Sequence, residues 1–189
     1  MNVSHRASLC RREEERLRRV KPSLGDAGKR ARAARPAHEQ VAECMRQGKR
    51  AQAMALITEV IKSNPTDAEA YMNRGSVQTS LGEVELAISD FTTAIRLDPN
   101  LAPAWYNRGT TLAHVGRYES VIADFTEAMR LQPDFPLAYC NRGLAKTELG
   151  RYDEALADYA KAIEQDPNST NCYFSRGTLS RDGRIPESD

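Results

Sequence analysis

Long apolar runs are missing from this 189-residue sequence. The longest stretch without Asp, Glu, Lys or Arg has nine residues, whereas a membrane-spanning helix needs about 20 predominantly apolar residues. The N-terminus also lacks the apolar segment of a secretory signal. Hydrophobic residues still make up 40% of the chain, which is enough to build a core. We therefore expect a folded, cytoplasmic protein without a membrane span.

Cysteine and histidine are scarce, and they are scattered along the chain. They are Cys10, Cys44, Cys140 and Cys172, and His5, His38 and His114. No Cys-x-x-Cys pair occurs and no histidine lies near a cysteine, so the spacing excludes a zinc site. Without a secretory signal, we expect reduced, buried cysteines rather than a disulfide framework. We assign the chain no metal and no cofactor.

Catalytic signatures are also missing. The sequence contains no GxSxG, HExxH or GxGxxG motif. Residues 25–30 resemble a phosphate loop only superficially, because the two glycines are too close together and Arg30 stands where Ser or Thr would bind magnesium. We therefore expect a protein that is not an enzyme and has no catalytic residues.

Aromatic residues are absent from the first 70 positions, and the charge of the first 36 of these is mostly positive. Residues 1–36 carry 11 Lys or Arg against 4 Asp or Glu, a net +7, whereas residues 37–189 carry 16 against 22, a net −6. A charged segment without aromatics cannot bury a core. We interpret residues 1–36 as a basic, Arg-rich tail, either disordered or partly helical. Its interspersed glutamates make nucleic acid an unfavoured partner.

What the sequence does contain is a repeat of 34 residues. The tripeptide Asn-Arg-Gly occurs at 73–75, 107–109 and 141–143, and Ser175-Arg176-Gly177 follows in step. One glycine and one proline of each period recur at the same spacing: Gly48, Gly82, Gly116 and Gly150, with Pro65, Pro99, Pro133 and Pro167. So many coincidences indicate a repeat architecture.

Each period is predicted to form two antiparallel helices. In residues 102–135, apolar residues follow helical spacing on both sides of Gly116, and the second helix must end before Pro133. A glycine inside each first helix, such as Gly75, lowers helix propensity by about 1 kcal/mol relative to alanine. We therefore expect the second helix to approach closely there, with Ala87 and Ala155 facing the glycines.

This pattern resembles the tetratricopeptide repeat family, whose motif has glycines, aromatics, alanines and a proline at fixed positions. The copy at 136–169 matches best, through Tyr139, Gly143, Gly150, Tyr152, Ala155, Tyr159, Ala162 and Pro167. The resemblance implies an all-α fold, a right-handed α-solenoid of antiparallel helix pairs with capped ends. We expect a degenerate first repeat at 37–67, full repeats at 68–101, 102–135 and 136–169, a capping helix at 170–180 and a frayed tail at 181–189.

The resemblance also implies a concave, peptide-binding face lined by the first helices. An asparagine row (Asn73, Asn107 and Asn141) recurs there, and an amide offers a ligand main chain both a donor and an acceptor. The remaining predicted lining residues are Met72, Tyr106, His114, Leu144 and Phe174. None of these is Lys or Arg, which favours a ligand with apolar or aromatic anchors over a chaperone C-terminal carboxylate. Alternatively, the asparagines hydrogen-bond within their own helix pairs.

Two further rows carry opposite charges. The arginine row is Arg74, Arg108, Arg142 and Arg176, and the aspartate row is Asp90, Asp124 and Asp158. A helical hairpin brings each arginine opposite the aspartate of its own repeat, although the aspartate one repeat earlier is also within reach. We expect structural ion pairs rather than a ligand site.

The sequence therefore predicts a protein–protein interaction scaffold that binds an extended peptide or partner segment. The alternative function is a regulatory or targeting subunit of an enzyme, acting through the basic N-terminal tail. Self-association through the ends of the solenoid is a further kind of contact that such an array allows. The identity of the protein partner does not follow from the repeat.

Overall fold

The computed structural model describes residues 37–181, and this part of the chain contains α-helices and no strands. The basic tail predicted at 1–36 and residues 182–189 of the predicted frayed tail lie outside the described residues. No helix within residues 37–181 is long and apolar enough to cross a membrane.

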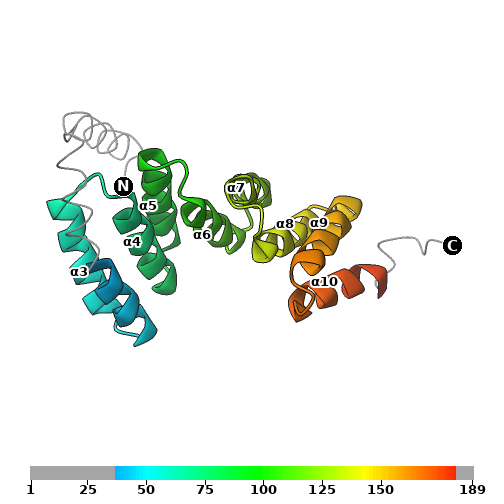
Figure 1. Cartoon of the computed structure of the whole chain (residues 1–189), viewed down its shortest axis with the longest axis horizontal. Coiled ribbons are helices and arrows are strands. Elements are labelled where there is room, and N and C mark those ends of the chain that lie inside the picture. Colours follow the sequence, from blue (N-terminus) through cyan, green and yellow to red (C-terminus); the bar gives the residue numbers. More distant parts are fainter. Residues whose placement is uncertain (1–36, 182–189) are drawn as a thin grey trace.

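The helices follow one another in chain order along the long axis of the molecule (Figure 1). A helical segment at 37–46 precedes them. They are α3 (Arg50–Ser63), α4 (Ala68–Ser80), α5 (Val84–Leu97), α6 (Ala102–Ala113), α7 (Tyr118–Leu131), α8 (Pro136–Glu148), α9 (Tyr152–Gln165) and α10 (Thr170–Arg181). The hairpins α4–α5, α6–α7 and α8–α9 pack against one another in series, which confirms the predicted all-α solenoid.

The turns inside the hairpins explain the glycine of each period. Gly82 and Gly116 have φ values of 77° and 71°, in the left-handed region that favours glycine. The Glu83 amide then donates to the Gln78 carbonyl at 2.9 Å and closes the end of α4. Proline occupies the first turn of α8, where its missing N–H leaves no helical hydrogen bond unmade.

The glycines inside the first helices make room for aromatic rings. A β-carbon on Gly143 would lie 2.7 Å from Tyr159 Cε1, and one on Gly75 would lie 2.8 Å from Phe91 Cε1. The second helix approaches closely at these glycines, as predicted, but the nearest side chain is an aromatic ring rather than Ala87 or Ala155. The glycine admits a ring that any larger residue would displace.

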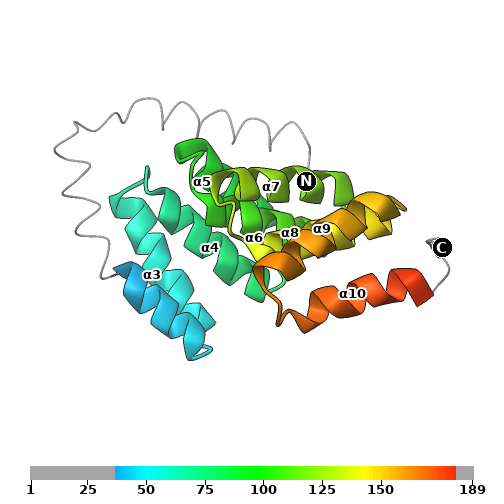
Figure 2. The ribbon, with the colours of Figure 1, turned by 45° about the vertical axis from the view of Figure 1, so that its right-hand side comes forward.

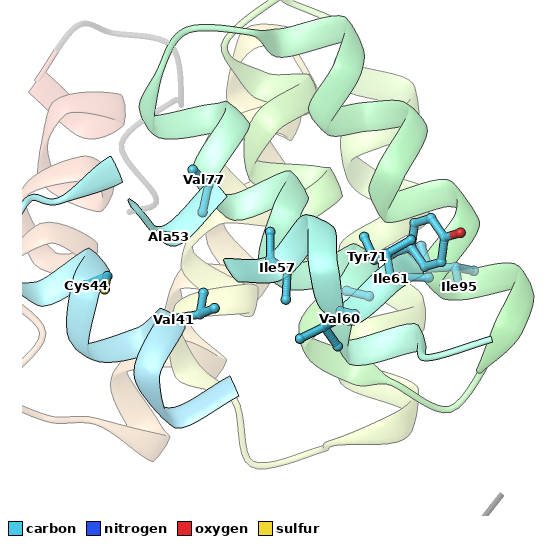
Figure 3. Packing of buried hydrophobic residues seen from close by; sticks show 12 residues of the cluster. Val41, Cys44, Ala53, Ile57, Val60, Ile61, Tyr71, Val77 and Ile95 are labelled. Atoms are coloured by element: carbon cyan, nitrogen blue, oxygen red, sulfur yellow. The ribbon is translucent and has the colours of Figure 1, made fainter. Parts of the chain in front are cut away.

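The core consists of clusters that form between neighbouring hairpins. In the first cluster, Val41 of the helical segment, Ile57 of α3, Tyr71 of α4 and Ile95 of α5 are all buried together (Figure 3). No hairpin buries its apolar face alone, so each one depends on its neighbours.

A disulfide joins Cys140 of α8 to Cys172 of α10. Their α-carbons lie 5.7 Å apart, within the range that a disulfide bridges, and both residues are buried. The expectation that the cysteines are reduced was therefore wrong for this pair. Cys44 is buried and free, as expected.

Candidate functional site

The first helices of the hairpins form one continuous layer. Helices α4 and α6, α6 and α8, and α8 and α10 are in direct contact. Among the described residues, the second helices α5, α7 and α9 make no contact with one another. The array is therefore closed more tightly on the side of the first helices, which makes that layer the inner face.

The asparagine row ties each repeat to the one before it. Asn141 donates its side-chain amide to the Tyr106 hydroxyl at 3.1 Å, and Asn107 donates to Ser76 Oγ across a longer 3.5 Å. Asn73 lies 3.2 Å from Nδ1 of His38 in the helical segment. The bonds therefore run between successive first helices and not within a helix pair.

The side-chain carbonyl oxygens of this row have no hydrogen-bond partner within residues 37–181. Because the amide nitrogens are held by the preceding repeat, the orientation of each amide group is fixed. While His38 is neutral, the asparagine row therefore presents three oriented acceptors on the layer of first helices.

A hydrogen-bonded triad extends the row at its N-terminal end. His38 Nε2 lies 3.2 Å from Asp67 Oδ2, and in the neutral ring this nitrogen donates while Nδ1 accepts from Asn73. The hydrogen bond to Asp67 raises the pKa of His38 although burial opposes it. Burial alone would raise the pKa of Asp67, but hydrogen bonds from His38 and from the Ala70 amide outweigh it, so this pKa is lowered.

The other predicted lining residues differ in their exposure. Met72 and Tyr106 are half-buried, and the Tyr106 ring lies 4.7 Å from the Phe135 ring, centroid to centroid. His114 is exposed at the C-terminal end of α6. Leu144 and Phe174 are the most available apolar side chains of the set, with exposed fractions of 42% and 69%. Apolar anchor points thus gather towards the C-terminal half of the array.

The arginine and aspartate rows meet inside each repeat. Arg108 donates from Nε and Nη2 to the two carboxylate oxygens of Asp124, both at 2.7 Å. Arg74 and Asp90, and Arg142 and Asp158, form the same two-pronged contact at 2.6–2.9 Å. All three aspartates are buried, so each carboxylate is compensated by its own repeat and not by the preceding one.

Each guanidinium also lies over an aromatic ring three residues earlier in its helix. The distance from Arg108 Cζ to the centroid of the Trp105 ring is 5.0 Å. The other stacks are Arg74 over Tyr71, Arg142 over Tyr139 and Arg176 over Tyr173. These cation–π contacts were not predicted from the sequence, although an arginine three residues after an aromatic residue on a helix is a signal for them.

Lys146 is a further charged residue whose role was not predicted from the sequence. Its side chain is buried, and Nζ lies 2.8 Å from Asp158 Oδ2 and 3.7 Å from Glu154. The repeat gives no signal for it, because Leu112 and Gln78 stand at the same place in the earlier repeats. Residues 37–181 contain no cluster of His, Cys, Asp and Glu that could hold a metal ion.

Two family models described as Tetratricopeptide repeat match the sequence. One matches residues 68–101 and again 136–169, and the other matches residues 91–123. These ranges include α4, α5 and α6 and the hairpin α8–α9.

Solved structures with the same fold include MamA and YrrB. The MamA fragment from Desulfovibrio magneticus RS-1 that begins at residue 41 is 22% identical, with a TM-score of 0.72 over 80% of this chain and 86% of that one. YrrB, described as a TPR protein with an unusual peptide-binding site, is 20% identical, with a TM-score of 0.69 over 83% and 85%.

A third structure holds a peptide. The first TPR domain of Spaghetti, solved with an HSP90 peptide, is 23% identical, with a TM-score of 0.59 over 61% of this chain and 91% of that one. These likenesses extend to the fold alone, and the family models identify the repeats. The chain therefore contains tetratricopeptide repeats.

Proposed function

We propose that the chain is a non-enzymatic scaffold that binds an extended segment of a partner protein on the inner face formed by α4, α6, α8 and α10. The observation that carries this proposal is the asparagine row, whose amide nitrogens are held by the preceding repeat while the carbonyl oxygens are left to accept hydrogen bonds. Such acceptors suit the N–H groups of a ligand main chain.

The spacing of the row suits a ligand in the polyproline II conformation. Helices that pack side by side lie about 8–10 Å apart, and a polyproline II segment rises about 9 Å over three residues, after which the same face of the backbone returns. Every third N–H of such a ligand would meet the next asparagine. The grip would act on the backbone and leave the ligand side chains free to vary.

The exposed apolar side chains supply the selective part of the contact. Leu144 and Phe174 offer apolar surface near the C-terminal end of the inner face, where ligand side chains of apolar or aromatic character would be buried. The peptide-binding site described for YrrB and the HSP90 peptide bound to Spaghetti support a peptide as the ligand class for this chain as well.

The experiment begins with peptides selected for binding to the full chain from a displayed library of unstructured segments. Two selected peptides with unlike side chains are titrated calorimetrically against the chain and against the double variant Asn107→Ala, Asn141→Ala. We expect the double variant to weaken both peptides by about 1–3 kcal/mol, a factor of about 5 to 150.

The matched control is Ser76→Ala, which removes the acceptor of the Asn107 amide but leaves the Asn107 carbonyl in place. A merely structural asparagine would make Ser76→Ala and Asn107→Ala equally harmful to binding. If the asparagine row binds the ligand, Ser76→Ala retains most of the affinity. Equal affinity of the chain and the double variant for both peptides would contradict the proposal.

A further inference from the structure

Within residues 37–181, the last arginine of the arginine row has no aspartate partner. Arg176 of α10 is exposed, and its guanidinium lies 5.4 Å from the centroid of the Tyr173 ring. None of the residues 37–181 forms an ion pair with it. Arg176 therefore repeats the stacked geometry of Arg74, Arg108 and Arg142, but its guanidinium donates no hydrogen bond to any residue of 37–181.

The glycine beside it is also open. A β-carbon on Gly177 would meet no atom within 4 Å, whereas one on Gly143 would lie 2.7 Å from the Tyr159 ring. Among the described residues, no helix covers this side of α10, which lies along α9 at the end of the array (Figure 2). Its opposite side is seated on the array through Cys172 and Leu179, both buried.

The three complete hairpins show what fills this arrangement. In each second helix an aspartate binds the arginine, and the aromatic residue that follows covers the glycine. The pairs are Asp90-Phe91, Asp124-Phe125 and Asp158-Tyr159. The complement of Arg176 and Gly177 is therefore a helix that carries an Asp-aromatic pair.

We propose that α10 is a docking site for a helix of another protein, which completes the last hairpin in trans. We call Tyr173, Arg176 and Gly177 the α10 socket. The incoming aspartate accepts two hydrogen bonds from the Arg176 fork, and the aromatic ring lies against the backbone at Gly177. This site lies on the side of the second helices, so it is separate from the inner face on which the proposed function rests.

Residues 1–189 offer no free donor for the α10 socket. Neither residues 1–36 nor residues 182–189 contain an aromatic residue, so these segments cannot supply the ring. The three helical Asp–aromatic pairs are already buried in their own hairpins, and a second copy would have to open a hairpin to donate one. The occupant that suits the Arg176 guanidinium and the open Gly177 is an acidic-aromatic amphipathic helix of a partner protein.

The probe for the test is a capped synthetic peptide with the sequence of α9, residues 152–165, labelled with a fluorophore. It is titrated into the full chain, and a second peptide carries Asn at the position of Asp158. We expect the first peptide to bind and the second to bind at least about ten-fold more weakly, because a two-pronged charged hydrogen bond is lost.

Variants of the chain locate the site. Gly177→Leu should abolish binding by filling the space of the ring, whereas Asn171→Leu places the same side chain at an exposed position elsewhere on α10 and should leave it unchanged. Arg176→Gln should weaken the first peptide by about ten-fold and have little further effect on the second, since the two changes remove one interaction.

Several results would overturn the proposal. Binding that survives Gly177→Leu would place the peptide elsewhere, for instance in exchange with the chain's own α9. Failure of the α9 peptide to bind at about 1 mM, a weak limit for a helix in a groove, would show that the socket does not recruit this pattern. Self-association of the chain that Gly177→Leu abolishes would assign the socket to a second copy instead. None of these results depends on the asparagine row.

Discussion

Arg108 holds Asp124 of its own repeat through two hydrogen bonds of 2.7 Å, while Asp90, the aspartate one repeat earlier, is held by Arg74. The Arg108 fork also reaches back to that earlier repeat, because Nη1 donates to Thr92 Oγ1 at 3.1 Å. One guanidinium thus compensates a buried carboxylate within its hairpin and contacts the neighbouring hairpin.

This pairing predicts that Arg108→Leu lowers the free energy of unfolding by about 3–5 kcal/mol, because Asp124 is left buried and uncompensated. Adding Asp124→Asn should recover part of that loss, whereas adding Asp90→Asn should deepen it by leaving Arg74 without its partner. Urea unfolding followed by circular dichroism measures all three variants. Recovery by Asp90→Asn and not by Asp124→Asn would refute the pairing.

Gly143 and Gly177 occupy the same position of the repeat, but replacing each by alanine should change the stability of the fold in opposite directions. At Gly143 the new methyl group would meet the Tyr159 ring at 2.7 Å, so Gly143→Ala should destabilise by about 1–3 kcal/mol. At Gly177 it would meet nothing within 4 Å, so Gly177→Ala should stabilise α10 by up to about 1 kcal/mol. Thermal melts of the two variants test this, and equal destabilisation would show that the α10 socket is already covered.

The disulfide should make stability sensitive to reducing agents. Cys140 and Cys172 are separated by 32 positions, and opening such a link typically costs about 2–4 kcal/mol. We expect reductant to lower the melting temperature of the chain and of Cys44→Ala, but not that of Cys172→Ala. If reductant left the melting temperature of the unmodified chain unchanged, this would contradict the disulfide.

The triad at the N-terminal end should give a defined pH dependence. The pKa of His38 is raised from 6.5 by its hydrogen bond to Asp67, so its stabilisation is complete below about pH 6.5 and is lost as the pH rises through the raised value. The pKa of Asp67 is lowered from 3.8, so its contribution is present above that pH and is lost in acid. The difference in stability between the chain and His38→Gln should therefore shrink from pH 6 to pH 9. A constant difference would show that His38 does not titrate against Asp67.

The repeat period predicted most of the fold, because each element has a local cause in the sequence. Gly116 marks a turn that requires positive φ, and Pro133 follows the helix that it ends. The side-chain packing inside each hairpin was harder to predict. The sequence shows that Gly143 lacks a side chain, but not whether an alanine or the Tyr159 ring takes the space.

The candidate site could be predicted only in outline. Periodicity placed the asparagine row on the first helices, yet the direction of each amide depends on the preceding repeat, as with Asn141 and the Tyr106 hydroxyl. Cys140 and Cys172 lie 32 positions apart, close to one period, which would have placed them on neighbouring first helices. Lys146 gave no such signal, because it breaks the repeat.

The most direct test of the binding account is a nuclear magnetic resonance titration of the labelled full chain with a selected extended peptide. We predict that the side-chain amide signals of Asn73, Asn107 and Asn141 shift on binding, together with the Leu144 methyl signals, while α5, α7 and α9 stay unperturbed. Shifts confined to α5, α7 and α9, with the asparagine signals unchanged at saturation, would contradict it.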